Sequence, residues 1–475
     1  MTTAGWPKRG IVLGVAIVCL SWLQGFGGDL RHPTGLSGAR DDDGYGPTLS
    51  FDAFGWASAP AEPAPSGSAR SSPAPAAEPG TPQGACGNGC GEANGCDEDE
   101  GCAEKNKCRW CHCGELGDPW TLPQPCCLKH LGINVSGWMQ GGLYTNAHGA
   151  PNNGPLGFNN LTNFNLHQLW LYAERKTDAE THGWDLGGRV DYVFGVDGPD
   201  TQAFGDQSWD FGWNSSRDYG SAIPQLYAEL AFGNWTIKGG RFYTPHGYEV
   251  VPATGNFFYS HSYMMFYAEP FTHTGFVATY KFCDHLSAFG GWVDGWDSGW
   301  ANRNGADLFL GGVNLTLSDR ASVAWSFTAG NWGTGAIGNA GDIFFHSLLF
   351  TYKLNDKWTY VFQHDLASNT GVVPGGTEWY GIAQYLIYQI NDCWSAGGRI
   401  EWFRDDDGVR VAPPGKPGSY YEATLGLNYK PHANLLVRPE IRWDWFDGTP
   451  GGARPYNNGL ADSQFSGGFD VIFTF

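Results

Sequence analysis

Charged side chains are scarce in this sequence of 475 residues, because Asp, Glu, Lys and Arg together make up only 16% and methionine occurs four times. Basic residues are the rarer sign, with 28 Lys and Arg against 48 Asp and Glu, which gives a formal net charge of -20. Nucleic-acid binding depends on clustered basic side chains that release counterions. The composition therefore excludes DNA and RNA as expected partners.

Long apolar runs are missing beyond the N-terminus. Lys8 and Arg9, an apolar run at 11–23 and small residues at 25–28 form the pattern of an export signal, so we expect a signal peptide over residues 1–27. The alternatives are a buried helix, a membrane anchor or a lipid attached at Cys19. No later window reaches 18 consecutive apolar residues, which excludes a further transmembrane helix. A membrane role would have to come from strands.

The segment after the signal lacks the apolar residues that could offset the entropy of ordering it. Residues 28–85 are dominated by Pro, Ala, Ser and Gly, and we expect them to form a disordered linker. The chain as a whole is rich in glycine (70) and in aromatic residues (22 Trp, 21 Tyr and 29 Phe), a balance that favours strands joined by tight turns.

A cysteine-rich segment at residues 86–131 follows the linker, and its place in an exported chain predicts that it lies in the periplasm. Disulfides are one interpretation, since a segment of this size cannot hold a core; a metal site around residues 108–113 and a flexible reduced segment are the others. The candidate ligands or disulfide partners are Cys86, Cys90, Cys96, Cys102, Cys108, Cys111, Cys113, Cys126 and Cys127. Nine is an odd number, so one thiol needs a partner elsewhere.

From residue 132 onward, apolar and polar residues alternate with the period of two that is typical of strands with one wet face. At residues 184–196, Trp184, Val190 and Phe194 share one face, and Arg189 and Asp191 lie on the other. Similar alternation recurs at residues 394–402, 420–429 and 435–445. We therefore expect residues 132–475 to be all-β.

Short and long connections alternate strictly along this region. The expected short turns are residues 177–182, 233–234, 283–285, 318–320, 355–356, 391–393 and 431–433, and the expected long loops are residues 146–162, 197–221, 244–270, 295–306, 332–341, 367–376, 405–418 and 446–463. Eight long loops and seven short turns imply sixteen strands, with fourteen or eighteen as alternatives. Such one-sided loop lengths predict a transmembrane antiparallel up-and-down β-barrel, because a soluble sandwich has no reason for them.

A barrel is the physical solution for strands in lipid, because a closed sheet leaves no backbone group without a partner. The apolar face must then point outward, with Trp and Tyr at strand ends near the two interfaces. Charged side chains on the opposite face would point into a water-filled lumen. They are Arg189, Asp191, Glu229, Arg399, Glu401, Glu422, Arg438, Glu440 and Arg442. These charges either filter small polar solutes or only hold the wall in shape, and the sequence leaves both open.

Three features carry a family resemblance: residues 168–174 (QLWLYAE), residues 239–249 (GGRFYTPHGYE) and the terminal Phe475. Through them, residues 132–475 resemble the OmpL-like family of outer-membrane β-barrel porins. It implies diffusion or transport across the bacterial outer membrane, with outer-membrane lipid and small polar solutes as partners. A last strand that ends in an aromatic residue resembles the signal read by the barrel-assembly machinery, and Phe475 would serve as that signal.

In sixteen-stranded porins, by the same resemblance, the third external loop folds into the lumen and narrows it. Here that loop is residues 244–270. We expect a constriction whose aromatic bias indicates an apolar or sugar-stacking wall rather than a purely ionic filter, lined by Tyr248, Glu249, Tyr259, His261, Tyr263 and Glu269.

Two other functions compete with a channel. An enzyme is disfavoured because no nucleophile motif or zinc-protease motif occurs, and no cofactor is expected. An envelope anchor or adhesin with little conductance is the alternative function. Cys283 and Cys393 lie in turns of distant hairpins, so they should not pair with each other, although one could tether the N-terminal segment. A homotrimer is left open by the sequence.

Overall fold

A computed structural model describes residues 116–475 except 180–182, 204–209, 214–217, 301–304, 336–337, 340, 372–374, 412–415, 450–451 and 453. The predicted signal peptide, the linker and seven of the nine clustered cysteines lie outside this part. Within it, no helix is long and apolar enough to cross a membrane.

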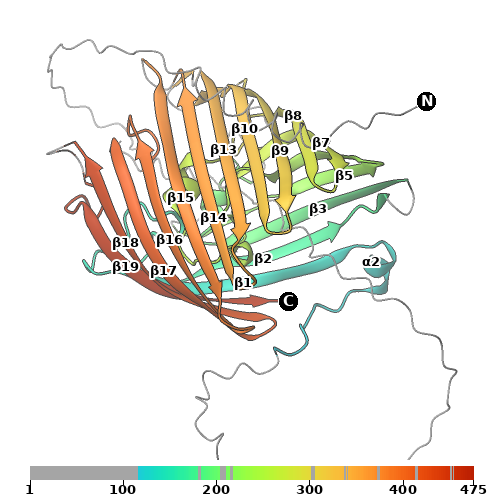
Figure 1. The fold of residues 1–475 in the computed structure, drawn as a ribbon, viewed down its shortest axis with the longest axis horizontal. Coiled ribbons are helices and arrows are strands. Elements are labelled where there is room, and N and C mark those ends of the chain that lie inside the picture. The colour runs from blue at the N-terminus through green and yellow to red at the C-terminus, as the bar shows by residue number, and fades with distance from the viewer. Residues whose placement is uncertain are drawn as a thin grey trace, which may run out of the picture. The chain divides into compact units, whose positions relative to one another are not determined.

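The described chain folds into one large closed antiparallel sheet and a two-stranded hairpin (Figure 1). The strands are β1 (Asn134–Asn146), β2 (Phe164–Arg175), β3 (Trp184–Gly195), β4 (Gly220–Ala222), β5 (Leu226–Phe232), β6 (Trp235–Tyr243), β7 (Thr272–Cys283), β8 (Leu286–Val293), β9 (Asp307–Ser318), β10 (Ala321–Asn331), β11 (Thr334–Gly335), β12 (Gly338–Asn339), β13 (Asp342–Lys353), β14 (Trp358–Asn369), β15 (Thr377–Gln389), β16 (Trp394–Asp405), β17 (Gly418–His432), β18 (Leu435–Gly448) and β19 (Ser463–Thr474). Short helical turns are α2 (Cys126–His130), η1 (Gly157–Asn159), α4 (Gly198–Thr201), η2 (Ala253–Gly255) and η3 (Met264–Ala268).

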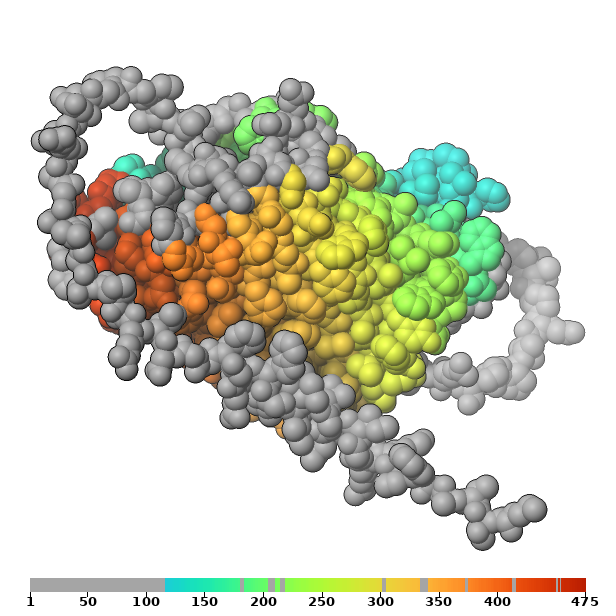
Figure 2. All heavy atoms as spheres, turned by 90° about the horizontal axis from the view of Figure 1, so that it is seen from above, coloured from blue at the N-terminus to red at the C-terminus, as the bar shows by residue number. Residues whose placement is uncertain are grey.

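The sheet closes where β1 pairs with β19, with Trp138 opposite Thr474 and Leu143 opposite Phe469. Strands β4 and β5 both pair with β3 and are separated only by residues 223–225, so together they form one barrel strand. The predicted sixteen-stranded barrel is therefore confirmed. Every other wall strand pairs with its neighbours in the chain, and Figure 2 shows the colours succeeding one another in that order from red to green. Closure removes the sheet edges that hydrocarbon would not tolerate.

The predicted order of short turns and long loops is confirmed as well. Two residues join β5 to β6 and two join β9 to β10, whereas the connection from β6 to β7 spans residues 244–271. The hairpin of β11 and β12 lies within the long loop that follows β10. Long loops meet at one end of the barrel and short turns at the other, because the strands are antiparallel.

Apolar side chains cover the outside of the barrel, as the alternation predicts. On β16 Ile400 is 56% exposed, and on β17 Leu425 is 62% exposed, while their neighbours Arg399 and Thr424 are buried on the inner side. Aromatic rings pair near strand ends: Trp394 stacks on Tyr429 with ring centroids 4.3 Å apart, and Tyr421 on Trp445 at 5.3 Å. Amphipathic rings are favoured at such positions, at the lipid–water interface.

Candidate functional site

The connection from β6 to β7, residues 244–271, lies inside the barrel and is called the inner loop below. Gln168 of β2 donates to the carbonyl of Val251 at 2.7 Å, and the hydroxyl of Ser326 on β10 lies 2.7 Å from the His246 ring. Nearly all side chains of the loop are buried. Because β2 and β10 belong to distant parts of the wall, the inner loop crosses the lumen.

An apolar cluster fills the space between the inner loop and the wall. It includes Val251, Phe258, Met264, Met265, Phe266 and Phe271 from the loop, with Trp170, Phe345 and Trp379 from the strands. This differs from the uniformly wet interior expected from the sequence. The reason is that apolar loop side chains bury one another once the loop's polar backbone groups are bound by the wall.

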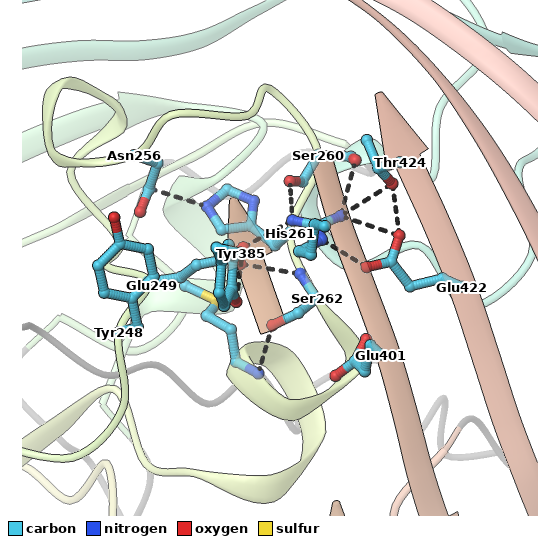
Figure 3. Close-up of polar contacts among 12 residues, drawn as sticks. Tyr248, Glu249, Asn256, Ser260, His261, Ser262, Tyr385, Glu401, Glu422 and Thr424 are labelled. Atoms are coloured by element: carbon cyan, nitrogen blue, oxygen red, sulfur yellow. Dashed lines mark hydrogen bonds and ion pairs between the residues drawn. The ribbon is translucent and has the colours of Figure 1, made fainter. Parts of the chain in front are cut away.

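Arg399 of β16 holds the first part of the inner loop. Its partners Glu249, Ser260 and Glu422 are labelled in Figure 3. Its guanidinium lies 2.6 Å from the carboxylate of Glu249 and donates to the carbonyl of Ser260 at 2.8 Å. The same guanidinium lies 2.5 Å from Glu422 of β17. Burial opposes ionisation of Glu249, but Arg399, His261 and the backbone N–H of Ser262 together outweigh it and lower the pKa of the Glu249 carboxyl.

Two further arginines of β18 bind peptide carbonyls of the inner loop. Arg438 donates to the carbonyls of Ala253 at 3.0 Å and Asn256 at 2.7 Å. Arg442 donates to the carbonyl of His261 at 2.6 Å. Both arginines are fully buried. Each forms an ion pair with a carboxylate of the wall: Asp470 lies 2.6 Å from Arg438, and Asp444 lies 2.7 Å from Arg442.

Two carboxylates of the same wall accept hydrogen bonds from the loop's backbone N–H groups. Glu440 accepts from Tyr259 at 2.8 Å and from Ser260 at 3.1 Å. Glu401 accepts from Tyr263 at 2.7 Å and Met264 at 2.6 Å. Arginines thus bind carbonyls and glutamates bind N–H groups, so the wall of β16–β18 matches the polar backbone of the loop group by group.

The last part of the inner loop is held by β14. Gln363 donates to the carboxylate of Glu269 and accepts from the backbone N–H of Tyr248 at 3.0 Å. Burial, and after it the nearby Asp365 carboxylate, raises the pKa of Glu269 well above its usual value. The Tyr248 ring packs on Tyr385 with centroids 4.7 Å apart.

The remaining candidate residues of the loop are held by contacts within the barrel and are largely buried. The Tyr259 hydroxyl lies 2.6 Å from His167, and the Tyr263 hydroxyl donates to Asp444 at 2.7 Å. Both tyrosines are only 1% exposed, which corrects the expectation of an aromatic surface open to sugars. His261 lies against Phe158, and burial lowers the pKa of its imidazole to about 4, so it is neutral at pH 7.

Arg189, Asp191 and Glu229 lie apart from this cluster, on the inner side of β3 and β5. Arg189 lies 2.6 Å from Asp191 and stacks over the Tyr172 ring at 4.3 Å. Glu229 lies 4.0 Å from Lys238 of β6, and these two side chains keep 20% and 30% exposure. The sequence grouped these charges with those of β16–β18, but the fold separates them into two charged walls.

Several residues of the cluster were not among the sequence candidates. They are Gln168, Gln363, Asp365, Tyr385, Asp444 and Asp470. The alternation pattern already put Asp444 and Asp470 on the inner face, so it could have found those two. The described residues contain no group of three or more His, Cys, Asp or Glu side chains that could hold a metal ion.

The end of the barrel with short turns also holds the segment that precedes β1. The backbone N–H of Trp120 donates to the side chain of Asn434 in the β17–β18 turn at 2.7 Å, and the Trp120 ring stacks on Phe473. The terminal Phe475 exchanges two backbone hydrogen bonds with Gly137 of β1.

Four cysteines are described. Cys126, Cys127 and Cys283 are free thiols in this structure. Cys393 is disulfide-bonded. The prediction that Cys283 and Cys393 do not pair with each other is confirmed.

Comparison with known families gives one match, to the family described as "Putative beta-barrel porin-2, OmpL-like", over residues 132–475. No curated protein sequence matches the chain.

Among solved structures, the outer membrane channel DcaP of Acinetobacter baumannii is similar to this chain, with 12% identity and a TM-score of 0.50 over 72% of this chain and 97% of the other. The anion-selective porin of Comamonas acidovorans is 9% identical, with a TM-score of 0.48 over 72% and 99%. Because its sequence identity is so low, the similarity to the DcaP channel supports the barrel fold and nothing about function.

Proposed function

Since the chain belongs to the OmpL-like family of beta-barrel porins, we propose that it is a channel through which small polar solutes diffuse across the bacterial outer membrane. The single observation that supports this most strongly is the distribution of charge. Ionised side chains line the inner face of β3, β5 and β6 and of β16–β18, while the outer face is apolar. A charged side chain on the inner face costs little free energy only where it lies beside water or a matched partner.

The two charged walls would have different roles. On β16–β18 the charges are buried against the inner loop, so they position the loop and thereby set the width of the lumen. On β3–β6 the pair of Glu229 and Lys238 stays partly exposed, with the Lys238 ammonium 4.2 Å from the Tyr227 ring. We assign the solute path to this second wall, and Arg189 and Glu229 to its lining, with the buried Asp191 behind them as the partner of Arg189.

The N-terminal segment would lie in the periplasm, because Trp120 is bound at the end of the barrel with short turns, which faces the periplasm in such barrels. Phe475 would be read by the barrel-assembly machinery. No catalytic activity is proposed.

The alternative is an envelope anchor or adhesin with little conductance. It is favoured by the density of bonds between the inner loop and the wall, which could close the lumen.

Planar-bilayer recordings of the detergent-folded protein separate the two functions. A channel should give discrete conductance steps, and deletion of residues 250–266 from the inner loop should enlarge them. A barrel that stays silent in both forms, while its heat-modifiable migration shows that it is folded, would favour the anchor. Steps of unchanged size after the deletion would remove the inner loop from the constriction.

A further inference from the structure

Three buried tryptophan rings meet at the end of the barrel that carries the long loops. Trp296 lies in the connection from β8 to β9, Trp332 directly follows β10, and Trp379 lies near the start of β15. Their ring centroids are 5.2 to 6.3 Å apart, and the Trp296 ring stands at 67° and 83° to the other two. The three rings therefore form the walls of a cage, called the tryptophan cage below, and not a flat stack.

The guanidinium of Arg410, in the connection from β16 to β17, lies in the tryptophan cage. Its Cζ atom is 4.8 Å from the ring centroid of Trp379, 5.9 Å from that of Trp332 and 6.0 Å from that of Trp296. Its Nε atom donates to the carbonyl of Tyr267 in the inner loop at 2.5 Å. A cation within about 6 Å of the face of an aromatic ring is attracted by the quadrupole of that ring. The cage thus offers three ring faces and a carbonyl acceptor to one planar cation.

Contacts other than those of Arg410 fix the position of the cage walls. The indole N–H of Trp296 donates to the hydroxyl of Thr328 on β10 at 3.1 Å. The indole N–H of Trp379 donates to the carbonyl of Ala268 in the inner loop at 3.0 Å. Because the barrel wall and the inner loop hold these rings, the cage should keep its shape when the guanidinium leaves it.

The turn that presents Arg410 is also fixed independently of the arginine side chain. The carboxylate of Asp405 accepts from the backbone N–H groups of Val409 at 3.0 Å, Arg410 at 2.8 Å and Val411 at 2.9 Å. The Val411 side chain is only 1% exposed and packs in the apolar cluster. Arg410 itself is partly exposed. Its side chain can therefore leave the cage by rotation while the turn stays in place.

Carboxylates lie at the long-loop end of the strands that carry the cage and of their neighbours. Asp307, Asp342 and Glu378 are exposed at the starts of β9, β13 and β15, and Asp407 is exposed in the turn after β16. Charges of one sign at an entrance raise the local concentration of ions of the opposite sign. This side of the barrel should therefore attract cations from solution.

We propose that the tryptophan cage binds the guanidinium group of a solute that reaches the barrel from outside the cell, and that Arg410 fills the cage when no solute is bound. A guanidinium suits the cage because it is planar, always charged and rich in N–H donors. Arg410 competes from its tether at an effective concentration in the millimolar range, so a solute must approach that concentration to displace it. The site needs a folded barrel but no conduction, so it goes beyond the channel proposed above, and its test measures binding alone.

Chemical rescue of the full-length, detergent-folded Arg410→Ala variant tests the site. The variant loses a charge-assisted hydrogen bond to the Tyr267 carbonyl, so hydrogen–deuterium exchange of peptides from residues 264–271 should become roughly tenfold faster. Millimolar N-ethylguanidinium should restore the wild-type exchange, whereas its neutral isostere N-ethylurea should not. Arg454→Ala is the control, because it removes an exposed arginine that binds the Leu460 carbonyl, and it should leave this exchange unchanged. No recovery with N-ethylguanidinium, or an equal recovery with N-ethylurea, would overturn the proposal.

A titration followed by broadening of the N-ethylguanidinium NMR signals measures the competition with Arg410. The wild type should need roughly tenfold more ligand for half-saturation than Arg410→Ala, because the tethered guanidinium occupies the same cage. Adding Trp332→Leu to Arg410→Ala should weaken binding roughly tenfold, and adding Trp394→Leu, at the opposite end of the barrel, should not. Equal half-saturation in the wild type and Arg410→Ala, or binding that Trp332→Leu leaves unchanged, would refute the cage.

Heat-modifiable migration shows whether each variant is folded. If Arg410→Ala does not fold, Arg410→Gln takes its place in both experiments, since it removes the charge and keeps most of the side-chain volume.

Discussion

The guanidinium of Arg399 on β16 lies 2.6 Å from the carboxylate of Glu249 in the inner loop, so that a wall strand and the loop share a buried ion pair. The same arginine also binds Glu422 of the neighbouring strand. Loss of the loop's carboxylate would therefore leave the arginine paired to the wall, and only its hydrogen bonds to Ser260 would still join it to the loop.

Glu249→Gln should loosen the inner loop without unfolding the barrel. Hydrogen bonds to charged groups contribute about 2 kcal/mol, so the population of released loop should rise roughly 30-fold. Hydrogen–deuterium exchange of peptides from residues 246–264 measures this. Glu229→Gln, on the other wall, is the control and should leave that exchange unchanged. Equal exchange in Glu249→Gln and wild type would show that the pair does not hold the loop.

Glu269 should make the loop less stable as pH rises. Its pKa in the folded protein is raised, so the folded state keeps the proton that a released loop loses above about pH 4.5. Stability contributed by this group is therefore present at low pH and falls as pH increases towards the raised pKa. Glu269→Gln should slow loop exchange at pH 8 relative to wild type and change little at pH 4. A variant that exchanges faster at pH 8 would contradict the direction of the shift.

Gly142 of β1 should be intolerant of a side chain, because a Cβ there would lie 2.6 Å from the Tyr259 hydroxyl. Gly142→Ala should displace Tyr259 from His167 and destabilise the packing by about 1–3 kcal/mol. Protease cleavage within the inner loop reports the change. A Cβ at the adjacent Gly141 would lie 3.2 Å from the end of the Phe164 side chain and 3.5 Å from the Asn165 carbonyl, so Gly141→Ala should behave nearly as wild type.

Charge on the β3–β6 wall should control ion selectivity if solutes pass there. Glu229→Gln should shift the reversal potential in a salt gradient towards anions, and Lys238→Met should shift it towards cations, since the two side chains are partly exposed. Arg442→Met is a poor probe because this arginine is buried against the loop. Unchanged reversal potentials in both variants would move the solute path to another wall.

Asn434 should keep the segment that precedes β1 in a fixed conformation. Its side chain accepts from the Trp120 N–H and donates to the Trp120 carbonyl at 2.8 Å. Asn434→Ala should speed exchange of the Trp120 amide roughly fivefold, for a loss of about 1 kcal/mol. Asn355→Ala removes a similar cap from another short turn and should leave Trp120 unaffected.

Much of the barrel could be predicted because its signals are local. The period of two put Arg399, Arg438 and Arg442 on the inner face, and the alternation of loop lengths gave the strand number. The sequence missed how the inner loop is bound, since each of its bonds joins residues far apart in the chain, such as Tyr263 and Asp444. Spacing along the chain carries no information about such pairs.

The sequence by itself determined which residues face outward and which face inward, because successive side chains of a strand point to opposite sides. Only the tertiary structure decided which inward charges are buried and which stay near open space. That choice depends on the path of the inner loop, which satisfies the wall of β16–β18 and leaves Glu229 and Lys238 on the other wall partly exposed.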